Sequence, residues 1–242
     1  MKKNSIGSWI TLGHPSIAEI MAHSNFDWLC IDMEHSVIDY FEAQQLISTI
    51  QSKGVLAFVR VGENNTRIIK RVLDSGADGI IVPMVNNKEQ AIKAINSVFY
   101  PPIGNRGVGL ARAQEYGFEF DKYVKNKARK IKLIIQIEHI DAINNLEEMI
   151  KLDGIDGTFI GPYDLSASLG KPGKFKDKDV IEALEKYKKI ALNSNKLVGI
   201  HVVNPDYKQV LEKKREGYNF IAFSSDIIFL GDTLKQNVSR LK

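Results

Sequence analysis

Cysteine is almost absent from this chain of 242 residues, since Cys30 is the only one. A single cysteine excludes an internal disulfide framework and any metal site built from several thiolates, and it favours a reducing compartment. No apolar run approaches the roughly 20 residues that a membrane-spanning helix needs. The 33 basic and 29 acidic residues give a net charge of +4 without a clustered basic patch. We therefore expect a soluble, cytoplasmic protein with neither a nucleic-acid partner nor a membrane partner.

What the chain does contain is an alternation of short apolar runs and longer amphipathic stretches. The apolar runs are nearly continuous, which is typical of parallel strands that are buried on both faces. We predict eight strands, near Ser5–Leu12, Trp28–Glu34, Leu56–Val61, Gly79–Val85, Lys132–Glu138, Gly157–Asp164, Lys196–Val203 and Asn219–Ser225. We predict eight helices, near Ser16–Ser24, Tyr40–Lys53, Asn65–Ser75, Lys88–Ser97, Ile140–Lys151, Lys178–Ser194, Pro205–Glu216 and Ile228–Leu241.

This alternation predicts a (β/α)8 barrel, the TIM barrel of the α/β class, in one domain over residues 1–242. A doubly wound open sheet is the structural alternative, but it usually has fewer strands, and no glycine loop of the kind that binds dinucleotides is present. Residues 99–131 form the longest irregular region. They include Tyr100-Pro101-Pro102 and several glycines, and irregular segments of this length are usually functional or disordered.

Catalytic groups of barrel enzymes lie at the C-terminal ends of the strands, and several predicted strands end in reactive side chains here. The second ends in Asp32-Met33-Glu34-His35, the third in Arg60, the fifth in Gln136-Ile137-Glu138, the sixth in Gly161-Pro162-Tyr163-Asp164 and the seventh in His201. Residues i and i+2 of a strand share a face. Asp32 and Glu34 are two residues apart, as are Gln136 and Glu138, so the two side chains of each pair are expected to point together toward the barrel mouth.

Carboxylates that gather at such a mouth need a cation, a basic partner or water. One interpretation is a metal site, in which Glu138 and Asp164 on neighbouring strands bind Mg²⁺ or Mn²⁺ together with water and substrate oxygens. His35 and Arg60 would then face the metal as a base and a fixed cation. The alternative interpretation is that the acids simply pair with nearby arginines.

Two other chemistries are disfavoured by what the strand ends lack. A Schiff-base aldolase needs a desolvated lysine at a strand end, whereas Lys132 and Lys196 stand at strand beginnings. Barrels that bind phosphate esters often carry glycine-rich loops after strands seven and eight. Here those loops read Asn204-Pro205-Asp206 and Ser225-Asp226-Ile227, so a phosphorylated substrate is not expected.

At these residues the sequence resembles the HpcH/HpaI aldolase family. The similarity runs from about Gly7 to Asp226. It is carried by Phe26-Asp27-Trp28-Leu29-Cys30-Ile31-Asp32-Met33-Glu34-His35, Val82-Pro83-Met84-Val85, Tyr100-Pro101-Pro102 through Arg106-Gly107-Val108-Gly109, Gln136-Ile137-Glu138 and Gly157-Thr158-Phe159-Ile160-Gly161-Pro162-Tyr163-Asp164-Leu165-Ser166. The Asp-x-Glu-His and Gly-Pro-x-Asp-Leu-Ser segments together make the resemblance specific.

The resemblance implies a class II pyruvate aldolase that reversibly cleaves a 2-keto-4-hydroxy acid to pyruvate and an aldehyde. It implies a divalent metal ion, Mg²⁺, Mn²⁺ or Co²⁺, and a homo-oligomer, a hexamer built as a trimer of dimers with exchanged C-terminal helices. The residues it singles out are Glu138 and Asp164 as metal ligands; His35, Arg60 and Asp74 as catalytic residues; Gln136, Gly161, Pro162, Tyr163 and Arg112 around the substrate; and Asp32 and Glu34 as residues that order metal-bound water.

Within these roles, the resemblance makes His35 the acid/base with Asp74 as its partner, and Arg60 the residue that steadies the enolate oxygen. Two departures concern the aldehyde side. The reference is the 4-hydroxy-2-oxoheptanedioate aldolases of this family. Tyr163 stands where those enzymes have a small residue, and the stretch from Val108 to Gln114 is slightly shorter than theirs. Two alternative functions stay open: a carbon–carbon lyase acting on an acyl-CoA thioester, as in citramalyl- and malyl-CoA lyases, and a non-catalytic barrel subunit.

Overall fold

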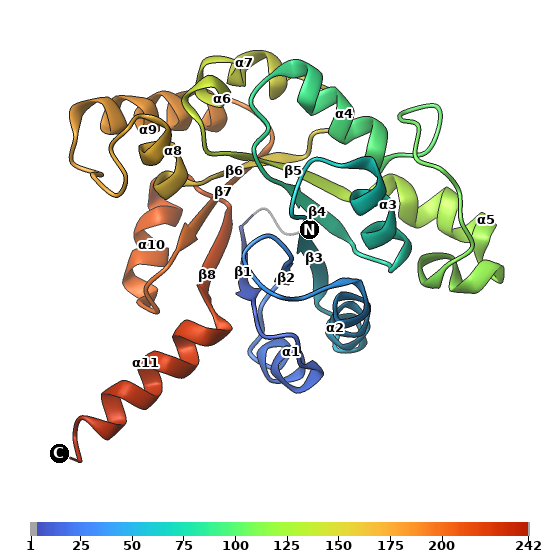
Figure 1. The fold of residues 1–242 in the computed structure, drawn as a ribbon, viewed down its shortest axis with the longest axis horizontal. Helices are drawn as coiled ribbons and strands as arrows, with labels where there is room; N and C mark the ends of the chain where they lie inside the picture. Colours follow the sequence, from blue (N-terminus) through green and yellow to red (C-terminus); the bar gives the residue numbers. More distant parts are fainter. Residues whose placement is uncertain (1–3, 242) are drawn as a thin grey trace.

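Eight parallel strands close into a barrel in the order in which they occur along the chain (Figure 1). The computed structural model describes residues 4–241. The strands are β1 (Ser5–Ile10), β2 (Trp28–Asp32), β3 (Leu56–Arg60), β4 (Gly79–Val82), β5 (Lys132–Ile137), β6 (Gly157–Ile160), β7 (Leu197–Val202) and β8 (Phe220–Ser225). Strand β8 pairs with β1 and closes the barrel. The predicted TIM barrel is confirmed.

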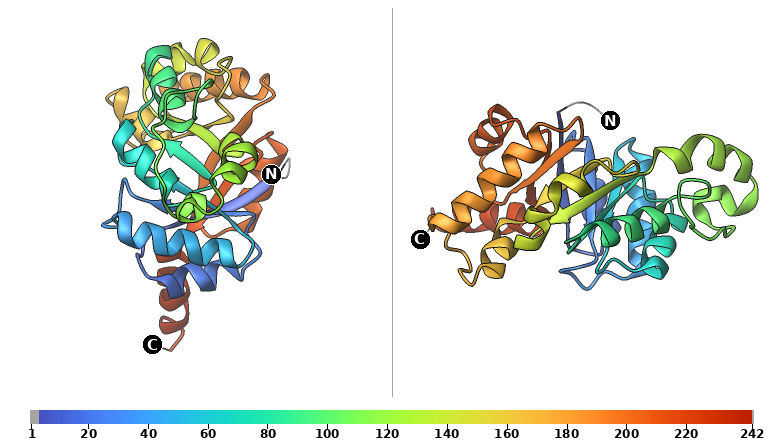
Figure 2. Two further views of the ribbon diagram at one scale, coloured as in Figure 1. Left: turned by 90° about the vertical axis from the view of Figure 1, so that its right-hand side faces the viewer. Right: turned by 90° about the horizontal axis from the view of Figure 1, so that it is seen from above.

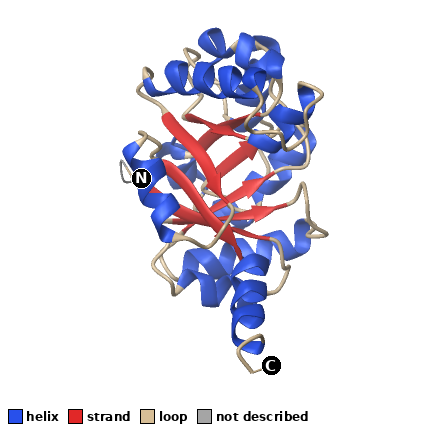
Figure 3. Ribbon diagram, turned by 90° about the vertical axis from the view of Figure 1, so that its left-hand side faces the viewer, coloured by secondary structure: helices blue, strands red, loops and turns tan. Residues whose placement is uncertain are grey.

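Helices form the outer layer around the strands, as Figure 3 shows. They are α1 (Pro15–Ala22), α2 (Tyr40–Ser52), α3 (Thr66–Asp74), α4 (Lys88–Val98), α6 (Ile140–Asn144), α7 (Leu146–Met149), α8 (Pro162–Ser168), α9 (Lys178–Leu192), α10 (Tyr207–Arg215) and α11 (Asp226–Val238). Buried aliphatic residues of the helices and of the outward strand faces form one continuous core between the two layers. Among residues 4–241, no helix is long and apolar enough to cross a membrane.

Three predicted elements differ from the structure. The sixth strand ends at Ile160, because Pro162 starts helix α8 and proline is favoured in a first helical turn. The single helix predicted over Ile140–Lys151 is divided into α6 and α7 at Asn145. Residues 99–131 are also more ordered than predicted. They contain the helical turns η1 (Arg112–Gly117), α5 (Phe120–Lys122), η2 (Tyr123–Lys127) and η3 (Ala128–Lys130), which extend beside the barrel (Figure 2).

Aromatic rings fill the interior of the barrel near the strand beginnings. The ring of Trp28 stacks on Phe220 with centroids 4.1 Å apart, and Phe58 packs against both. Glycines on neighbouring strands make room for these rings. A Cβ atom added to Gly7 would lie 2.0 Å from Trp28, and one added to Gly79 would lie 2.2 Å from Phe58. Cys30 belongs to the same buried cluster.

This packing predicts that Gly79→Ala destabilises the protein. The new methyl group must displace Phe58, which Trp28 and Phe220 hold in place, and overpacking of this kind costs about 1–3 kcal/mol. Urea unfolding followed by circular dichroism should show a lower midpoint than in the wild type. The matched control is Gly231→Ala on α11, where nothing lies within 4 Å of the added Cβ. Equal midpoints for the two variants would contradict the packing argument.

Candidate active site

The C-terminal ends of the strands surround a cavity of about 220 Å³. The buried rings of Trp9 and Phe159 close it toward the barrel interior. Residues singled out from the sequence make up half of its lining: Asp32, Arg60, Gln136, Gly161, Pro162, Tyr163 and Asp164. The cavity thus joins side chains from three strands to the first turn of α8, at the end of the barrel where catalytic groups were expected.

Asp32 and Arg60 form a two-pronged ion pair across neighbouring strands. The two residues are partners in the register of β2 and β3. Arg60 Nε donates to Asp32 Oδ1 at 3.0 Å, and Arg60 Nη2 donates to Oδ2 at 2.6 Å. Arg60 also lies over the ring of Trp9, 4.4 Å from its centroid. The guanidinium is therefore held in one orientation by Asp32 and Trp9.

The turn after β2 presents Glu34 and His35 at the mouth. Asp32 Oδ1 accepts hydrogen bonds from both of their backbone N–H groups, which makes this segment a turn and not a continuation of the strand. Glu34 Oε2 lies 3.3 Å from Arg60 Nη1 and 3.7 Å from His35 Nε2. Burial raises the pKa of Glu34 to about 7, in spite of the nearby Arg60. The His35 side chain is 64% exposed and faces solvent.

Glu138 is a buried carboxylate of the site. It follows β5 and is buried; its Oε1 accepts the Met84 N–H at 2.7 Å and its Oε2 accepts the Gln136 side-chain amide. Burial raises the pKa of Glu138, and the Asp164 carboxylate raises it further, against these two hydrogen bonds. A Cβ atom at position 161 would lie 3.0 Å from Glu138 Cβ, so Gly161 allows this close approach.

The oxygen atoms around the cavity fit a hard divalent cation. At the mouth of the barrel, Arg60 stands among four acidic side chains, Asp32 and Asp164 in the lining of the cavity and Glu34 and Glu138 close to it. Glu34 Oε2 and Gln136 Oε1 are buried without a hydrogen-bond partner. Oxygen donors of this kind are preferred by Mg²⁺ and Mn²⁺. Within residues 4–241 there is no group of three or more His, Cys, Asp or Glu arranged to hold an ion, so water and substrate oxygens would complete the coordination.

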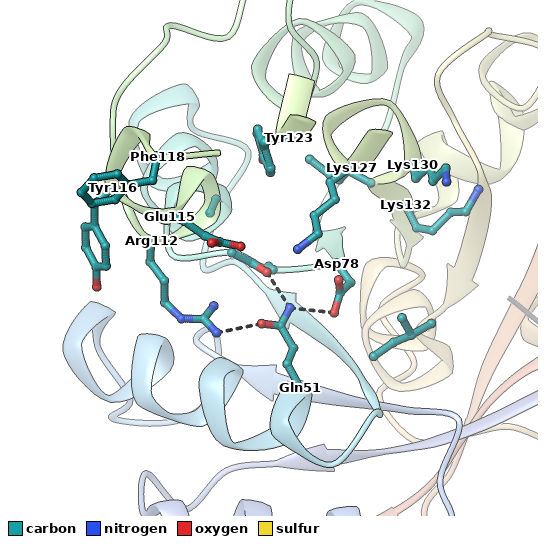
Figure 4. Close-up of a pocket in the computed structure, with 15 residues that line it drawn as sticks. Gln51, Asp78, Arg112, Glu115, Tyr116, Phe118, Tyr123, Lys127, Lys130 and Lys132 are labelled. Carbon is teal, nitrogen blue, oxygen red and sulfur yellow. Dashed lines mark hydrogen bonds between the residues drawn. The ribbon is translucent and has the colours of Figure 1, made fainter. Parts of the chain in front are cut away.

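Two residues expected near the substrate lie at the other end of the barrel within one chain. Asp74 ends α3, and a helix that follows a strand returns its C-terminus to the level of the strand beginnings. There Asp74 pairs with Arg106 Nη2 at 2.6 Å. Arg112 donates to the Ser75 carbonyl at 2.9 Å and to Gln51 Oε1 at 3.0 Å (Figure 4). Within one chain, Asp74 therefore does not contact His35, and Arg112 does not line the cavity at the mouth.

Other residues of the site were not predicted from the sequence. Trp9 supports the Arg60 guanidinium, and Met84 uses its backbone N–H to hold Glu138 while in a left-handed conformation with φ of 51°. Trp9 lies near the end of the first predicted strand, so its position could have placed it at the mouth. The Met84 donor is a backbone N–H, which every residue except proline has, so the residue type could not have predicted it. His201, at the end of the seventh strand, lines the cavity, and its Nε2 lies 3.2 Å from the Ser224 carbonyl oxygen.

His201 predicts a pH dependence of stability. Burial lowers the pKa of its imidazole to about 4, and Arg60 lowers it further. Above pH 6.5 the group is neutral in both states; between pH 6.5 and 4 only the unfolded state binds the proton, so stability falls as pH falls. His201→Gln should avoid about 2 kcal/mol of this loss at pH 5. Thermal unfolding at pH 7.5 and pH 5 measures it, and an identical fall in Tm for both proteins would refute the explanation.

Comparisons with known proteins agree with this geometry. The model of the HpcH/HpaI aldolase/citrate lyase family matches residues 5–231. The 2-keto-3-deoxy-L-rhamnonate aldolase of Klebsiella pneumoniae subsp. pneumoniae is 37% identical over 246 residues, covering 99% of this chain and 90% of that protein. The hydroxypyruvate/pyruvate aldolase of Roseobacter denitrificans is 36% identical over 237 residues, covering 98% of this chain and 92% of that protein. The crystal structure of a family protein from Burkholderia cenocepacia has a TM-score of 0.93 at 30% identity, over 99% of this chain and 95% of that one.

Proposed function

This chain belongs to the HpcH/HpaI aldolase/citrate lyase family and is a lyase, and we propose that it is a divalent-metal-dependent pyruvate aldolase. Its substrate would be a 2-keto-4-hydroxy acid, cleaved reversibly to pyruvate and an aldehyde. One observation carries the proposal. The fixed guanidinium of Arg60 and the carboxylate of Asp164 line one small cavity at the end of the barrel where enzymes of this fold act, and the buried carboxylate of Glu138 lies directly behind Gln136 and Gly161 of its lining.

Glu138 and Asp164 are the residues that would hold the metal ion, Mg²⁺, Mn²⁺ or Co²⁺. They come from neighbouring positions around the barrel, after β5 and at the start of α8, and each raises the pKa of the buried Glu34. When bound, a divalent ion supplies positive charge to the keto oxygen as negative charge develops there. A cation here would also offset the repulsion among these carboxylates.

Arg60 would face the oxygen that gains charge as the carbon–carbon bond breaks. The fragment left by the cleavage is the enolate of pyruvate, and donors fixed in place before the reaction stabilise such a charge best. Asp32 fixes two edges of the guanidinium and Trp9 covers its face. Gln136, which also lines the cavity, would contact the pyruvyl group. The N–H groups in the first turn of α8, beginning at Gly161-Pro162-Tyr163, would bind its carboxylate.

His35 would remove the proton from the 4-hydroxyl group. A histidine suits this step because its ordinary pKa lies near neutrality. His35 stands at the exposed rim of the mouth, where the aldehyde half of the substrate would lie, and its Nε2 is 3.7 Å from the Glu34 carboxylate. Proton acceptor and oxyanion donor are thus separate groups, and Glu34 lies within 4 Å of both His35 and Arg60.

The proposal predicts that metal removal and loss of Glu138 each abolish retro-aldol activity. Dialysis against a chelator should reduce kcat by at least about a hundredfold, with recovery on addition of Mg²⁺, Mn²⁺ or Co²⁺. Glu138→Ala should show a similar loss that metal does not restore. Pyruvate release from 2-keto-4-hydroxy acids, coupled to lactate dehydrogenase, provides the measurement.

Glu147→Gln, at an exposed position on α7, is the matched control and should keep full activity. Full activity of the metal-free enzyme or of Glu138→Ala would reject the metal-dependent mechanism. Cleavage of acyl-CoA thioesters without cleavage of free keto acids would identify the protein as a carbon–carbon lyase that acts on acyl-CoA thioesters. No activity with any aldehyde in the condensation direction would indicate a non-catalytic barrel.

We propose further that the active unit is a homo-oligomer joined through α11. This helix projects from the barrel (Figures 1 and 2). Exposed apolar side chains at a spacing of three or four residues form one stripe along it: Ile227, Leu230, Leu234 and Val238. A stripe of this spacing is typical of a helix packed against a partner. An oligomer also gives the expected contact between His35 and Asp74 a physical route, because Asp74 of a second copy is the one that could reach His35.

Complementation between two inactive variants tests this arrangement. His35→Ala and Asp74→Asn should each lose most activity, and hybrid oligomers from co-expression should recover about one quarter of the wild-type rate, since one site in four then combines both intact residues from different chains. A mixture of His35→Ala with Glu138→Ala is the control and should stay inactive. No recovery in the first mixture, or a wild-type sedimentation coefficient for the double variant Leu230→Glu/Leu234→Glu, would contradict the arrangement.

A further inference from the structure

The C-terminal ends of β7 and β8 form a wall of the candidate active site to which the proposed reaction assigns no role. His201 lines the cavity from β7, Val203 lines it from the residue that follows this strand, and Ser225 lines it from the end of β8. The proposed ligands of the metal ion lie elsewhere around the barrel, after β5 and at the start of α8. The wall is therefore available to a part of the substrate that the metal ion does not hold.

The Ser224 carbonyl selects one tautomer of His201. His201 Nε2 lies 3.2 Å from the carbonyl oxygen, which can only accept a hydrogen bond, so Nε2 carries the proton. Burial lowers the pKa of His201 to about 4, and the charge of Arg60 lowers it further, so the ring is neutral at pH 7. The other ring nitrogen, Nδ1, then carries a lone pair. Among residues 4–241, no group donates a hydrogen bond to this Nδ1.

The backbone of β8 holds this carbonyl in place. Gly7 pairs with Ala222 and Trp9 with Ser225, so β8 has one residue more than β1 between these pairs. An extra residue of this kind forms a β-bulge, which redirects neighbouring groups. Ser224, within the bulge, has a φ of 53°, and strained non-glycine backbone is concentrated at functional sites. The orientation of the His201 ring is therefore set before a substrate binds.

Ser225 contributes a second polar group to this wall. It is the N-cap residue of α11, where a serine side chain ordinarily accepts a backbone N–H group of the first helical turn. Its side chain makes no such bond here, and across the described part of the chain no other group pairs with its hydroxyl. Ser225 is nevertheless only 5% exposed. Buried polar groups nearly always have a hydrogen-bond partner, so this hydroxyl points to a ligand in the cavity.

These two groups are complementary to a hydroxyl group. Nδ1 of the neutral His201 only accepts a hydrogen bond, whereas the Ser225 hydroxyl can donate one. A hydroxyl group of a ligand can donate to the first and accept from the second. A carboxylate has no proton to donate, and an ammonium group has no lone pair with which to accept. Val203 adds only apolar surface, so the wall suits a neutral hydroxyl group.

The wall lies close to the proposed contact with the keto oxygen. His201 and Arg60 both pack on the ring of Trp9, with the imidazole centroid 5.9 Å and the guanidinium carbon 4.4 Å from the centroid of that ring. Arg60 is the proposed donor to the keto oxygen on carbon 2 of the substrate. A hydroxyl group near carbon 2 is therefore the part of the substrate that this wall can reach.

We propose that His201 and Ser225 bind a second hydroxyl group of the substrate, in addition to the 4-hydroxyl group that reacts. On carbon 3 it makes the substrate a 2-keto-3,4-dihydroxy acid, and on carbon 5 it makes the aldehyde product a 2-hydroxyaldehyde. This inference rests on the proposed aldolase function, and the reaction stays the same. The bond between carbons 3 and 4 breaks, the 4-hydroxyl group loses its proton as carbon 4 becomes the aldehyde, and carbon 3 takes up a proton.

Three condensation reactions of the full-length enzyme with Mg²⁺ separate the two positions. Pyruvate with propanal gives a product without the second hydroxyl, hydroxypyruvate with propanal places it on carbon 3, and pyruvate with either enantiomer of 2-hydroxypropanal places it on carbon 5. For one hydroxyl-bearing pair, kcat/KM should exceed that for pyruvate with propanal by at least about tenfold. Equal values for all pairs would overturn the inference alone. No condensation with any pair would reject the proposed aldolase function, and the inference with it.

Variants assign the preference to this wall, because comparing the same pairs in each protein cancels differences in the reactivity of the compounds. His201→Leu and Ser225→Ala should each remove most of the preference, while kcat/KM for pyruvate with propanal stays within about threefold of the wild type. Ser225→Ala deletes a single oxygen atom, so it serves as the test if His201→Leu does not fold. His23→Leu, at an exposed position after α1, is the matched control and should keep the preference. An unchanged preference in the two wall variants would overturn the inference.

Discussion

The ion pair between Asp32 and Arg60 organises the mouth of this barrel. It links β2 to β3 at the level where both strands end, and Asp32 also accepts the backbone N–H groups of Glu34 and His35. A single carboxylate therefore sets the orientation of the guanidinium and the path of the turn that carries the neighbouring acid and base. A partly buried pair of this kind gains little stability by itself, since desolvation offsets most of the attraction. What the pair does is hold Arg60, the proposed oxyanion donor, and His35, the proposed base, in fixed relative positions before a substrate binds.

The same mouth gathers more negative charge than the chain neutralises. Glu34 and Glu138 are both buried enough for their pKa values to rise; the Glu138 carboxylate raises the pKa of Glu34 further, and the Asp164 carboxylate raises both. Burying neighbouring carboxylates destabilises the folded state. The apolar clusters of the barrel interior and of the layer between strands and helices offset this destabilisation. An acidic site that is unfavourable when empty is well suited to bind a cation and an anionic keto acid together, because the cation relieves the repulsion and then attracts the acid.

The sequence predicted the residues at the C-terminal ends of the strands more accurately than those at the opposite end of the barrel. Apolar runs locate strand ends to within a few residues, and in a parallel barrel all C-terminal strand ends meet, so Asp32, Arg60 and Glu138 could be placed at one mouth. Pro162 was the local exception, since it moves Asp164 from a strand to a helix without moving it away from the mouth. Residues 99–131 have no strand or helix periodicity strong enough to show which end of the barrel they cover, and this is why the position of Arg112 within the chain could not be predicted.

The two arginines of that segment show why their surroundings matter more than their sequence context. Arg106 is fully enclosed: it pairs with Asp74, donates to the Tyr123 hydroxyl at 3.1 Å and lies over the ring of Tyr100. These contacts satisfy its charge and anchor the segment to α3. Arg112 lies beside the same helix end but meets only neutral oxygens. The same residue type thus anchors the segment through a paired charge at one position and through neutral hydrogen bonds at the other, a difference that tertiary contacts decide and the local sequence does not show.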